Sequence, residues 1–134
     1  MRFLSIYKSV ETNRPPTLEE MTVMGQHVEE AMKAGVLLAT EGCLPSARGA
    51  RVRLSEGEVI VTDGPFTESK EVIGGFAILE VASREEAIVL AKNFLKIAGD
   101  GECELRELYS ASAAPACGPA EQHTRMTEQF ADIA

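Results

Sequence analysis

The sequence predicts a single α+β domain, an antiparallel sheet with two main helices on one face, of the ferredoxin-like kind. Two capping boxes support this prediction, because Thr17-Leu18-Glu19-Glu20 and Ser83-Arg84-Glu85-Glu86 each open a stretch of apolar helical periodicity. Each predicted helix lies between two β-favouring segments, so the order strand, helix, strand occurs twice. The length of 134 residues suits one domain.

The first half of the chain is interpreted as strand, helix and strand. Phe3 to Tyr7 is apolar and β-favouring, and the polar loop Glu11 to Pro16 follows it. The first helix begins after Thr17 and ends at Gly35, which supplies a C-terminal stop. Val36 to Thr40 predicts a short strand. The apolar face of the helix consists of Leu18, Met21, Met24, Val28, Ala31 and Met32.

A hairpin follows the loop Gly42 to Gly49. Its strands are predicted over Arg51 to Leu54 and Val59 to Thr62, with Glu56-Gly57 as the turn signal.

The second half repeats the pattern. Phe76 to Val81 is apolar on both faces, which predicts a central strand. A helix then runs from the Ser83 cap to Gly99, and Glu102 to Tyr109 predicts the final strand.

The domain is expected to end near Tyr109, where the composition changes. Residues 110–119 are rich in Ala, Ser and Pro, which is typical of a flexible connector. Residues 120–134 place Met126, Phe130 and Ile133 at helical spacing. They predict a short amphipathic helix that docks on its own subunit or on a neighbour, and so a contact for a protein partner.

Charge and composition exclude several classes of partner. The net charge of −8 disfavours nucleic acid, and no segment approaches about 18 consecutive apolar residues, so no membrane partner is expected. The first residues carry no export signal, which favours the cytoplasm. Cys43, Cys103 and Cys117 lack zinc-ligand spacing, so we expect free thiols and no metal. Gly74-Gly75 extends to no nucleotide-binding pattern, and no cofactor is expected.

The stretch Asp63-Gly64-Pro65-Phe66 combines turn chemistry with a charged cluster. The Asp63 carboxylate can cap local N–H groups and so hold the turn. In the alternative interpretation, Asp63, Glu68 and Lys70 line a polar cleft, where Lys70 attracts an anionic group and a carboxylate moves a proton. Salt bridges among the same residues explain the composition equally well.

Two further residues are candidates for the same cleft. Glu41 precedes Gly42 at a strand end, from which it either points into the cleft or stays an exposed turn acid. His27 lies at the flank of the first helix's apolar face. It is either a boundary histidine or a general acid–base group, and the second role requires Asp63 or Glu41 within hydrogen-bond reach.

Several separated blocks resemble the YCII-related, DGPF-domain family over residues 1–109. The blocks are Ala34-Gly35-Val36-Leu37, Glu41-Gly42, Asp63-Gly64-Pro65-Phe66, Glu68, Lys70-Glu71, Gly74-Gly75-Phe76, Glu86-Ala87 and Glu104-Leu105-Arg106. The resemblance implies a ferredoxin-like domain that pairs its sheets in a dimeric α/β barrel. It also implies a bacterial protein, a family sometimes fused to sigma-factor modules, and no established reaction.

The resemblance also implies an acid–base pair made of a first-helix histidine and an aspartate. Asp63 matches the family's aspartate in the Asp-Gly-Pro-Phe motif. Alignment by Gly35 places the histidine position nearer Met24 than His27, so the pair is half present.

Two function classes follow. The first is a domain that binds a small polar molecule in a cleft near the Asp-Gly-Pro-Phe loop. The second is a non-catalytic regulatory or protein-interaction module linked to transcription through sigma-factor association. Whether the protein catalyses a reaction stays open. A sheet covered on one face also predicts a homodimer, with Leu79, Val81 and the apolar residues of Phe3 to Tyr7 as interface candidates.

Overall fold

The computed structural model describes residues 1–12 and 14–110. Within these residues the elements follow the predicted order. They are β1 (Arg2–Ser9), α1 (Leu18–Lys33), β2 (Leu37–Gly42), the 3-10 turn η1 (Ser46–Arg48), β3 (Ala50–Ser55), β4 (Glu58–Asp63), β5 (Val72–Glu80), α2 (Arg84–Ala98) and β6 (Glu102–Glu107). The predicted helix over residues 120–134 and connector residues 111–119 lie outside the described residues.

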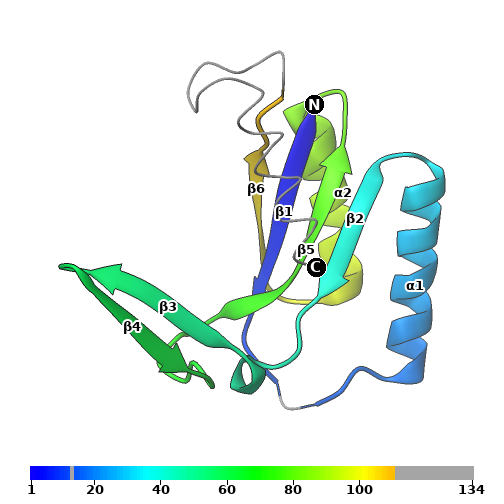
Figure 1. The fold of residues 1–134 in the computed structure, drawn as a ribbon. Helices are drawn as coiled ribbons and strands as arrows, with labels where there is room; N and C mark the ends of the chain where they lie inside the picture. Colours follow the sequence, from blue (N-terminus) through cyan, green and yellow to red (C-terminus); the bar gives the residue numbers. More distant parts are fainter. Residues whose placement is uncertain (13, 111–134) are drawn as a thin grey trace, which may run out of the picture.

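Four strands form an antiparallel sheet in the order β2-β5-β1-β6. This arrangement of strands and helices agrees with the ferredoxin-like prediction. Both helices cover the same face of the sheet, and β5 lies between β1 and β2 as predicted for a central strand (Figure 1). The strand begins at Val72, earlier than expected, so Gly74 and Gly75 lie inside it. In the described part of the chain, neither helix is long and apolar enough to cross a membrane.

Local signals set the ends of the helices. The capping box of α1 is complete, because the Thr17 hydroxyl accepts from the Glu20 N–H and the Glu20 carboxylate accepts from the Thr17 N–H. Gly35, with φ of 77°, ends this helix in the left-handed conformation. The capping box of α2 has a different hydrogen-bond pattern. Ser83 accepts from the Glu86 N–H, but the Glu86 carboxylate accepts from the Ala82 N–H, one residue before the cap.

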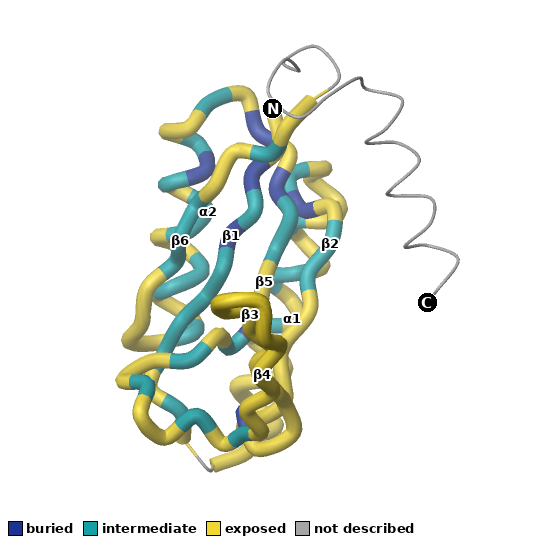
Figure 2. Tube along the Cα trace, turned by 60° about the vertical axis from the view of Figure 1, so that its left-hand side comes forward, coloured by how far each residue is buried: buried dark blue, intermediate teal, exposed yellow. Residues whose placement is uncertain are grey.

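The core lies at one end of the sheet. Its buried apolar residues are Phe3, Leu37, Leu79, Val81 and Ala87. Figure 2 shows that the buried positions gather toward the end that carries the N-terminus. No residue of α1 is buried, and Leu18, Met21 and Met32 of its predicted apolar face are exposed. Only Val28 and Ala31 of that face pack against the core cluster, because α1 stands away from the sheet.

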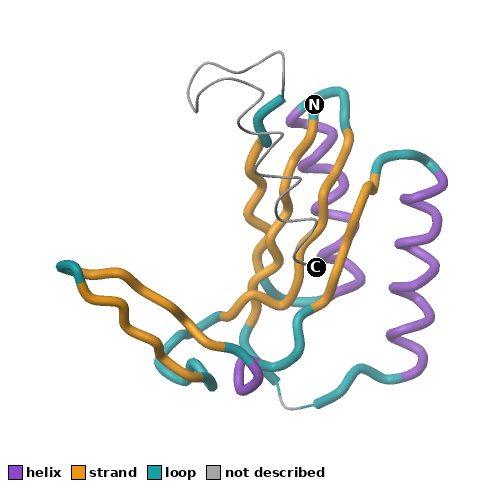
Figure 3. The backbone as a smooth tube through the Cα atoms, viewed as in Figure 1, coloured by secondary structure: helices purple, strands orange, loops and turns teal. Residues whose placement is uncertain are grey.

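The hairpin β3–β4, residues 50–63, is called the arm below. It turns through Glu56 and Gly57, whose positive φ values of 50° and 81° are those of a two-residue hairpin turn. The arm projects from the side of the sheet opposite the helices (Figures 1 and 2). Loops over residues 43–49 and 64–71 join it to β2 and β5 (Figure 3).

The sheet face that the helices leave uncovered is called the open face below. Side chains alternate along a strand, so the burial of Phe3 and Leu79 on the helix side directs their neighbours to the open face. Two apolar cross-strand pairs lie there, Leu4 with Ile78 and Ile6 with Phe76. The expected interface residues Leu79 and Val81 are therefore wrong, because both are core residues with exposed fractions of 7% and 5%.

Candidate functional site

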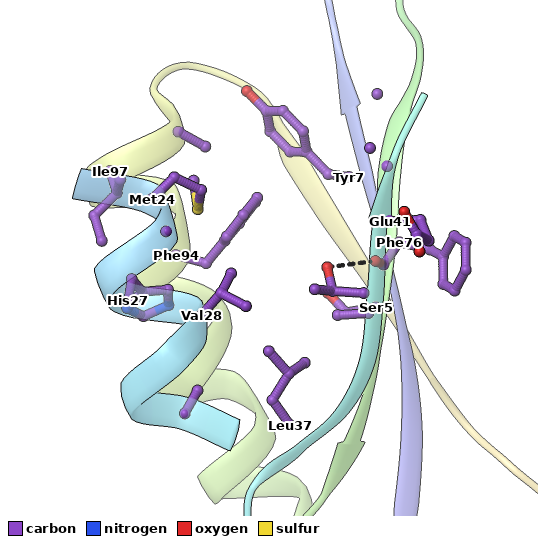
Figure 4. Close-up of a pocket in the computed structure, with 18 of the residues that line it drawn as sticks. Ser5, Tyr7, Met24, His27, Val28, Leu37, Glu41, Phe76, Phe94 and Ile97 are labelled. Carbon is purple, nitrogen blue, oxygen red and sulfur yellow. Dashed lines mark hydrogen bonds between the residues drawn. The ribbon is translucent and has the colours of Figure 1, made fainter. Parts of the chain in front are cut away.

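A cavity of about 710 Å³ lies between the two helices and the sheet. It exists because α1 packs on the core through few residues. Most of its lining side chains are apolar. They include Met21, Met24, Val28, Ala31, Leu37, Ala77, Leu79, Leu90, Phe94 and Ile97. Figure 4 shows Met24, Val28 and Phe94 on the helix side of this space and Tyr7 and Leu37 toward the sheet.

A few polar groups border the apolar lining. The Tyr7 hydroxyl donates to the Asp100 carbonyl at 3.1 Å, and its ring meets Phe94 edge-on with centroids 5.2 Å apart. The Thr40 hydroxyl donates to the Phe76 carbonyl at 2.9 Å. His27 lines the cavity from α1. The polar atoms of Tyr7 and Thr40 are thus committed to the backbone, whereas no hydrogen bond to a described residue occupies the imidazole.

An ion pair lies at one end of the lining. The Arg14 guanidinium is 2.9 Å from a Glu20 carboxylate oxygen. Its hydrogen bond, together with the Thr17 N–H, lowers the pKa of Glu20 below the ordinary carboxyl value. At the sheet's edge, burial raises the pKa of the Cys103 thiol, so this cysteine is a packed thiol rather than an activated nucleophile.

Glu41 borders the cavity only through its backbone. It pairs with Phe76 in the sheet, and Figure 4 shows both side chains on the side of the strand away from Ser5, Tyr7 and Leu37. The Glu41 carboxylate therefore lies on the open face. His27 and Glu41 come from neighbouring elements, but the sheet separates their side chains.

The acidic loop residues lie at the base of the arm, away from the cavity lining. Glu68 forms an ion pair of 2.8 Å with Arg51. Asp63 is exposed at the end of β4, opposite Ala50, and Lys70 is exposed in the loop. Neither accepts nor donates a side-chain hydrogen bond to a described residue. The structure thus does not bring Asp63 and His27 together.

A smaller hollow lies on the arm itself. Its volume is about 270 Å³, and Glu68 contributes to it with Arg51, Arg53, Ile60 and Thr62. Asp63 and Lys70 are absent from its lining. The predicted polar cleft of Asp63, Glu68 and Lys70 is therefore represented by Glu68 alone.

Ser46 takes the capping role that one interpretation of the sequence gave to Asp63. Its buried hydroxyl donates to a Glu11 carboxylate oxygen at 2.6 Å and accepts from the Phe66 N–H at 3.1 Å. The Ser46 N–H donates to the other Glu11 oxygen. The N–H of Gly64 donates to the Gly49 carbonyl at 3.0 Å. The expectation that Asp63 caps this turn is wrong, because loop 43–49 already supplies the acceptors.

Sequence reasoning missed Glu11 and Ser46 for a physical reason. Ser46 is 35 residues from Glu11 and 20 residues from Phe66, so no local spacing signals the contact. Hydrogen bonds from the Ser46 side chain and backbone lower the pKa of Glu11. The three residues fasten the loop after β1 and both loops of the arm to one another.

Comparisons with known proteins place this geometry in a family. The family model described as "YCII-related domain" matches residues 1–112. A protein of Rhizobium meliloti (strain 1021), described as uncharacterised, is 40% identical over 62 residues, which are 46% of this chain and 50% of that relative. The match thus spans about half the length of the curated relative.

A solved structure gives a more distant likeness. It is the 5-chloro-2-hydroxyhydroquinone dehydrochlorinase of Burkholderia phenoliruptrix AC1100 in complex with 2,5-dihydroxybenzoquinone, with a TM-score of 0.47 and 17% sequence identity over 86% of this chain and 100% of that chain. The family model covers all of the residues that build the sheet, the helices and the arm. The chain belongs to the YCII-related domain family.

Proposed function

We propose that the protein binds a small, largely apolar organic molecule in the cavity between α1 and the sheet. The observation that supports this proposal is the cavity of about 710 Å³ with its apolar lining. Pockets that bind small molecules have volumes of roughly 300–1,000 Å³ and combine apolar walls with a few polar groups. The proposal replaces the polar ligand expected from the loop residues.

His27 is the residue that we propose for polar recognition. An imidazole offers one donor and one acceptor, or two donors when charged, and no described residue forms a hydrogen bond with it. A general acid–base role requires a second group within reach, and Asp63 and the Glu41 carboxylate both lie elsewhere. The geometry therefore supports binding, and assigns no reaction.

Filling the cavity tests the proposal. Gly25 of α1 lines the cavity, and a Cβ added there meets no atom within 4 Å, so we choose Gly25→Leu to fill part of the space. Gln26→Leu is the matched control, because Gln26 is exposed and lies outside the lining. An anilinonaphthalene sulfonate dye serves as the probe, and native mass spectrometry identifies any co-purified molecule.

We expect Gly25→Leu to lose dye binding by at least tenfold and to lose any co-purified molecule, while Gln26→Leu keeps both. The melting temperature of Gly25→Leu should rise or stay constant, because glycine is a poor helix former. Equal binding by both variants would place the dye outside the cavity and refute the proposal.

We further propose that two chains pair through the open face, as the family resemblance led us to expect. The pairs Leu4 with Ile78 and Ile6 with Phe76 supply the apolar centre. Charges of both signs surround it, including the ion pair of Lys8 and Glu104 at 3.0 Å. In a twofold dimer the same surface of both subunits forms the interface, so positive and negative groups around the apolar centre can pair with each other.

The second function class, an interaction module, is favoured by one observation. The arm exposes aliphatic side chains to solvent, and contiguous apolar patches of this kind are typical of contact surfaces.

A further inference from the structure

The two faces of the arm differ in chemistry. The strand register places Val52 opposite Val61 and Leu54 opposite Val59. These four residues share one face, here called the apolar arm face, because positions two apart on a strand point the same way. Their exposed fractions are 69%, 60%, 71% and 66%. The arm thus carries a continuous aliphatic surface without cover from the described residues.

The opposite face of the arm is occupied. The Arg51 guanidinium lies 3.9 Å from the centroid of the Phe66 ring and donates to Glu68 at 2.8 Å and to Ser69 at 2.9 Å. Ser46 holds Phe66 in turn through its backbone N–H. These contacts fix the arm to the body, so the apolar arm face is presented in one orientation. Such preorganisation lowers the entropy cost of a contact.

The arm and the open face lie on the same side of the molecule. Figures 1 and 2 both show the arm leaving the sheet on the side away from the helices. The chain therefore has two apolar surfaces that meet at an angle, the four aliphatic residues of the arm and the two cross-strand pairs of the open face. A second molecule that binds to the open face therefore comes within reach of the arm.

We propose that the apolar arm face packs against a second copy of this chain, clasping the subunit that is paired through the open face. The inference rests on the pairing proposed above. A standard interface buries about 800 Å² per partner, and four aliphatic side chains supply only part of that area. The open face and the arm together supply a larger interface area. In a dimer with a twofold axis, the arm of each subunit contacts the other subunit. A second copy therefore suits the arm better than an occupant of the arm alone.

A tryptophan reporter tests the clasp. The sequence contains no tryptophan, so a single introduced indole reports only its own surroundings. Leu54→Trp places it on the apolar arm face, and Arg53→Trp places it on the opposite face of the same strand. Each full-length variant is diluted from high to low micromolar and nanomolar concentration while emission and light scattering are recorded.

We expect the emission of Leu54→Trp to shift to longer wavelength as the dimer dissociates, whereas Arg53→Trp keeps a constant emission. A dimer in which Leu54→Trp is solvent-exposed at every concentration overturns the clasp and leaves the pairing intact. A monomer at every concentration overturns both. A monomer in which Leu54→Trp is buried also overturns the clasp, since it identifies an occupant within the same chain.

A second pair of variants avoids the bulky reporter. Val59→Thr with Val61→Thr keeps β-branched side chains but removes apolar surface from the apolar arm face. Ile60→Thr, on the opposite face, is the matched control. The dissociation constant of the dimer should rise roughly 100-fold in the double variant and less than threefold in the control. Equal dissociation constants would overturn the clasp even if the reporters fail to fold.

Discussion

At the scale of single residues, the polar side chains near the Asp-Gly-Pro-Phe motif are of two kinds: some hold the loops together by hydrogen bonds, and others face solvent. Ser46 connects Glu11 to the Phe66 N–H from a buried position, whereas Asp63 is exposed and its carboxylate forms no hydrogen bond with a described residue. An unpaired buried donor costs more than a lost surface charge. The stability of this region should therefore depend on Ser46 rather than on Asp63.

Ser46→Ala should lower the free energy of unfolding by about 1–3 kcal/mol, because it removes the hydroxyl that accepts from the Phe66 N–H and donates to one Glu11 oxygen. Asp63→Ala and Asp63→Asn should each change it by less than about 0.5 kcal/mol, as is usual for surface positions. Urea denaturation followed by circular dichroism measures all three. A larger loss in Asp63→Ala than in Ser46→Ala would contradict this assignment.

Glu11 makes the same junction sensitive to acid. Hydrogen bonds to Ser46 lower the pKa of Glu11 in the folded state, so its ionised form stabilises the fold above the ordinary carboxyl value of about 4.3. This contribution is lost as the pH falls through the lowered pKa. In Glu11→Gln the melting temperature should be lower than in the wild type at pH 7, and the difference should shrink as the pH falls below the ordinary carboxyl value of about 4.3 and through the lowered pKa of Glu11.

Differential scanning calorimetry across this pH range checks the prediction. Glu29→Gln is the control, because it removes an exposed carboxylate that pairs with Lys33 on the surface of α1. A difference between wild type and Glu11→Gln that stays constant with pH would show that the carboxylate's charge is irrelevant to the junction.

At the scale of elements, the sequence predicted what local chemistry determines. The Thr17 box, the Gly35 stop and the Glu56-Gly57 turn are contacts between near neighbours, and each was read from spacing. The apolar periodicity of α1 predicted a helix correctly but predicted burial wrongly. Periodicity shows that a helix has an apolar face, and only the packing of distant elements decides whether a cavity lies beneath it.

In the candidate site, too, features set by local sequence were predicted and features set by the packing of distant elements were not. His27 was identified from its position on the helix, and it does line the cavity. The Glu41 carboxylate was interpreted either as a group in the cleft or as an exposed turn acid. The second alternative is confirmed, because Glu41 is exposed, and strand alternation and the register with Phe76 place its carboxylate on the open face. A one-residue difference in register reverses the face of a side chain, and the β2 register contains an irregularity between Leu37 and Ala39 that sequence does not signal.

The attachment of the arm depends on close backbone packing at Gly64. A Cβ at this position would lie 1.7 Å from the Ser46 carbonyl oxygen, a distance that requires the backbone to move. Gly64→Ala should therefore lower the free energy of unfolding by about 2 kcal/mol or more and disturb the arm. Gly42→Ala is the control, because a Cβ there meets no atom within 4 Å.

Thermal denaturation measures the stability of both glycine variants, and amide exchange by NMR locates the change. We expect faster exchange in residues 46–66 of Gly64→Ala and unaltered exchange in β1 and β6. Equal stability of the two variants would mean that loop 43–49 yields easily, and the arm would then not be held in one orientation.

At the scale of the whole molecule, the two faces of the sheet are covered unequally. The helices cover one face, and Leu4, Ile6, Phe76 and Ile78 form the centre of the other. The sequence predicted that this face requires burial, but its interface candidates mixed the two faces, because apolar character alone does not distinguish the two faces of a strand. Leu79 and Val81 are core residues, whereas Leu4 and Ile6, within Phe3 to Tyr7, lie on the open face. The register makes that distinction.

Phe76→Lys tests whether a second chain covers this face. The Phe76 side chain is 37% exposed in the single chain, so lysine at this position can extend into solvent in a monomer but would be buried in the paired form. Light scattering at micromolar concentration should report a dimer for the wild type and a monomer for Phe76→Lys, with unchanged far-ultraviolet circular dichroism. Val89→Lys, at a position of α2 that is 53% exposed, should remain dimeric. If Phe76→Lys keeps the mass of a dimer, the chains pair through another surface. The open face would then be free for a different partner.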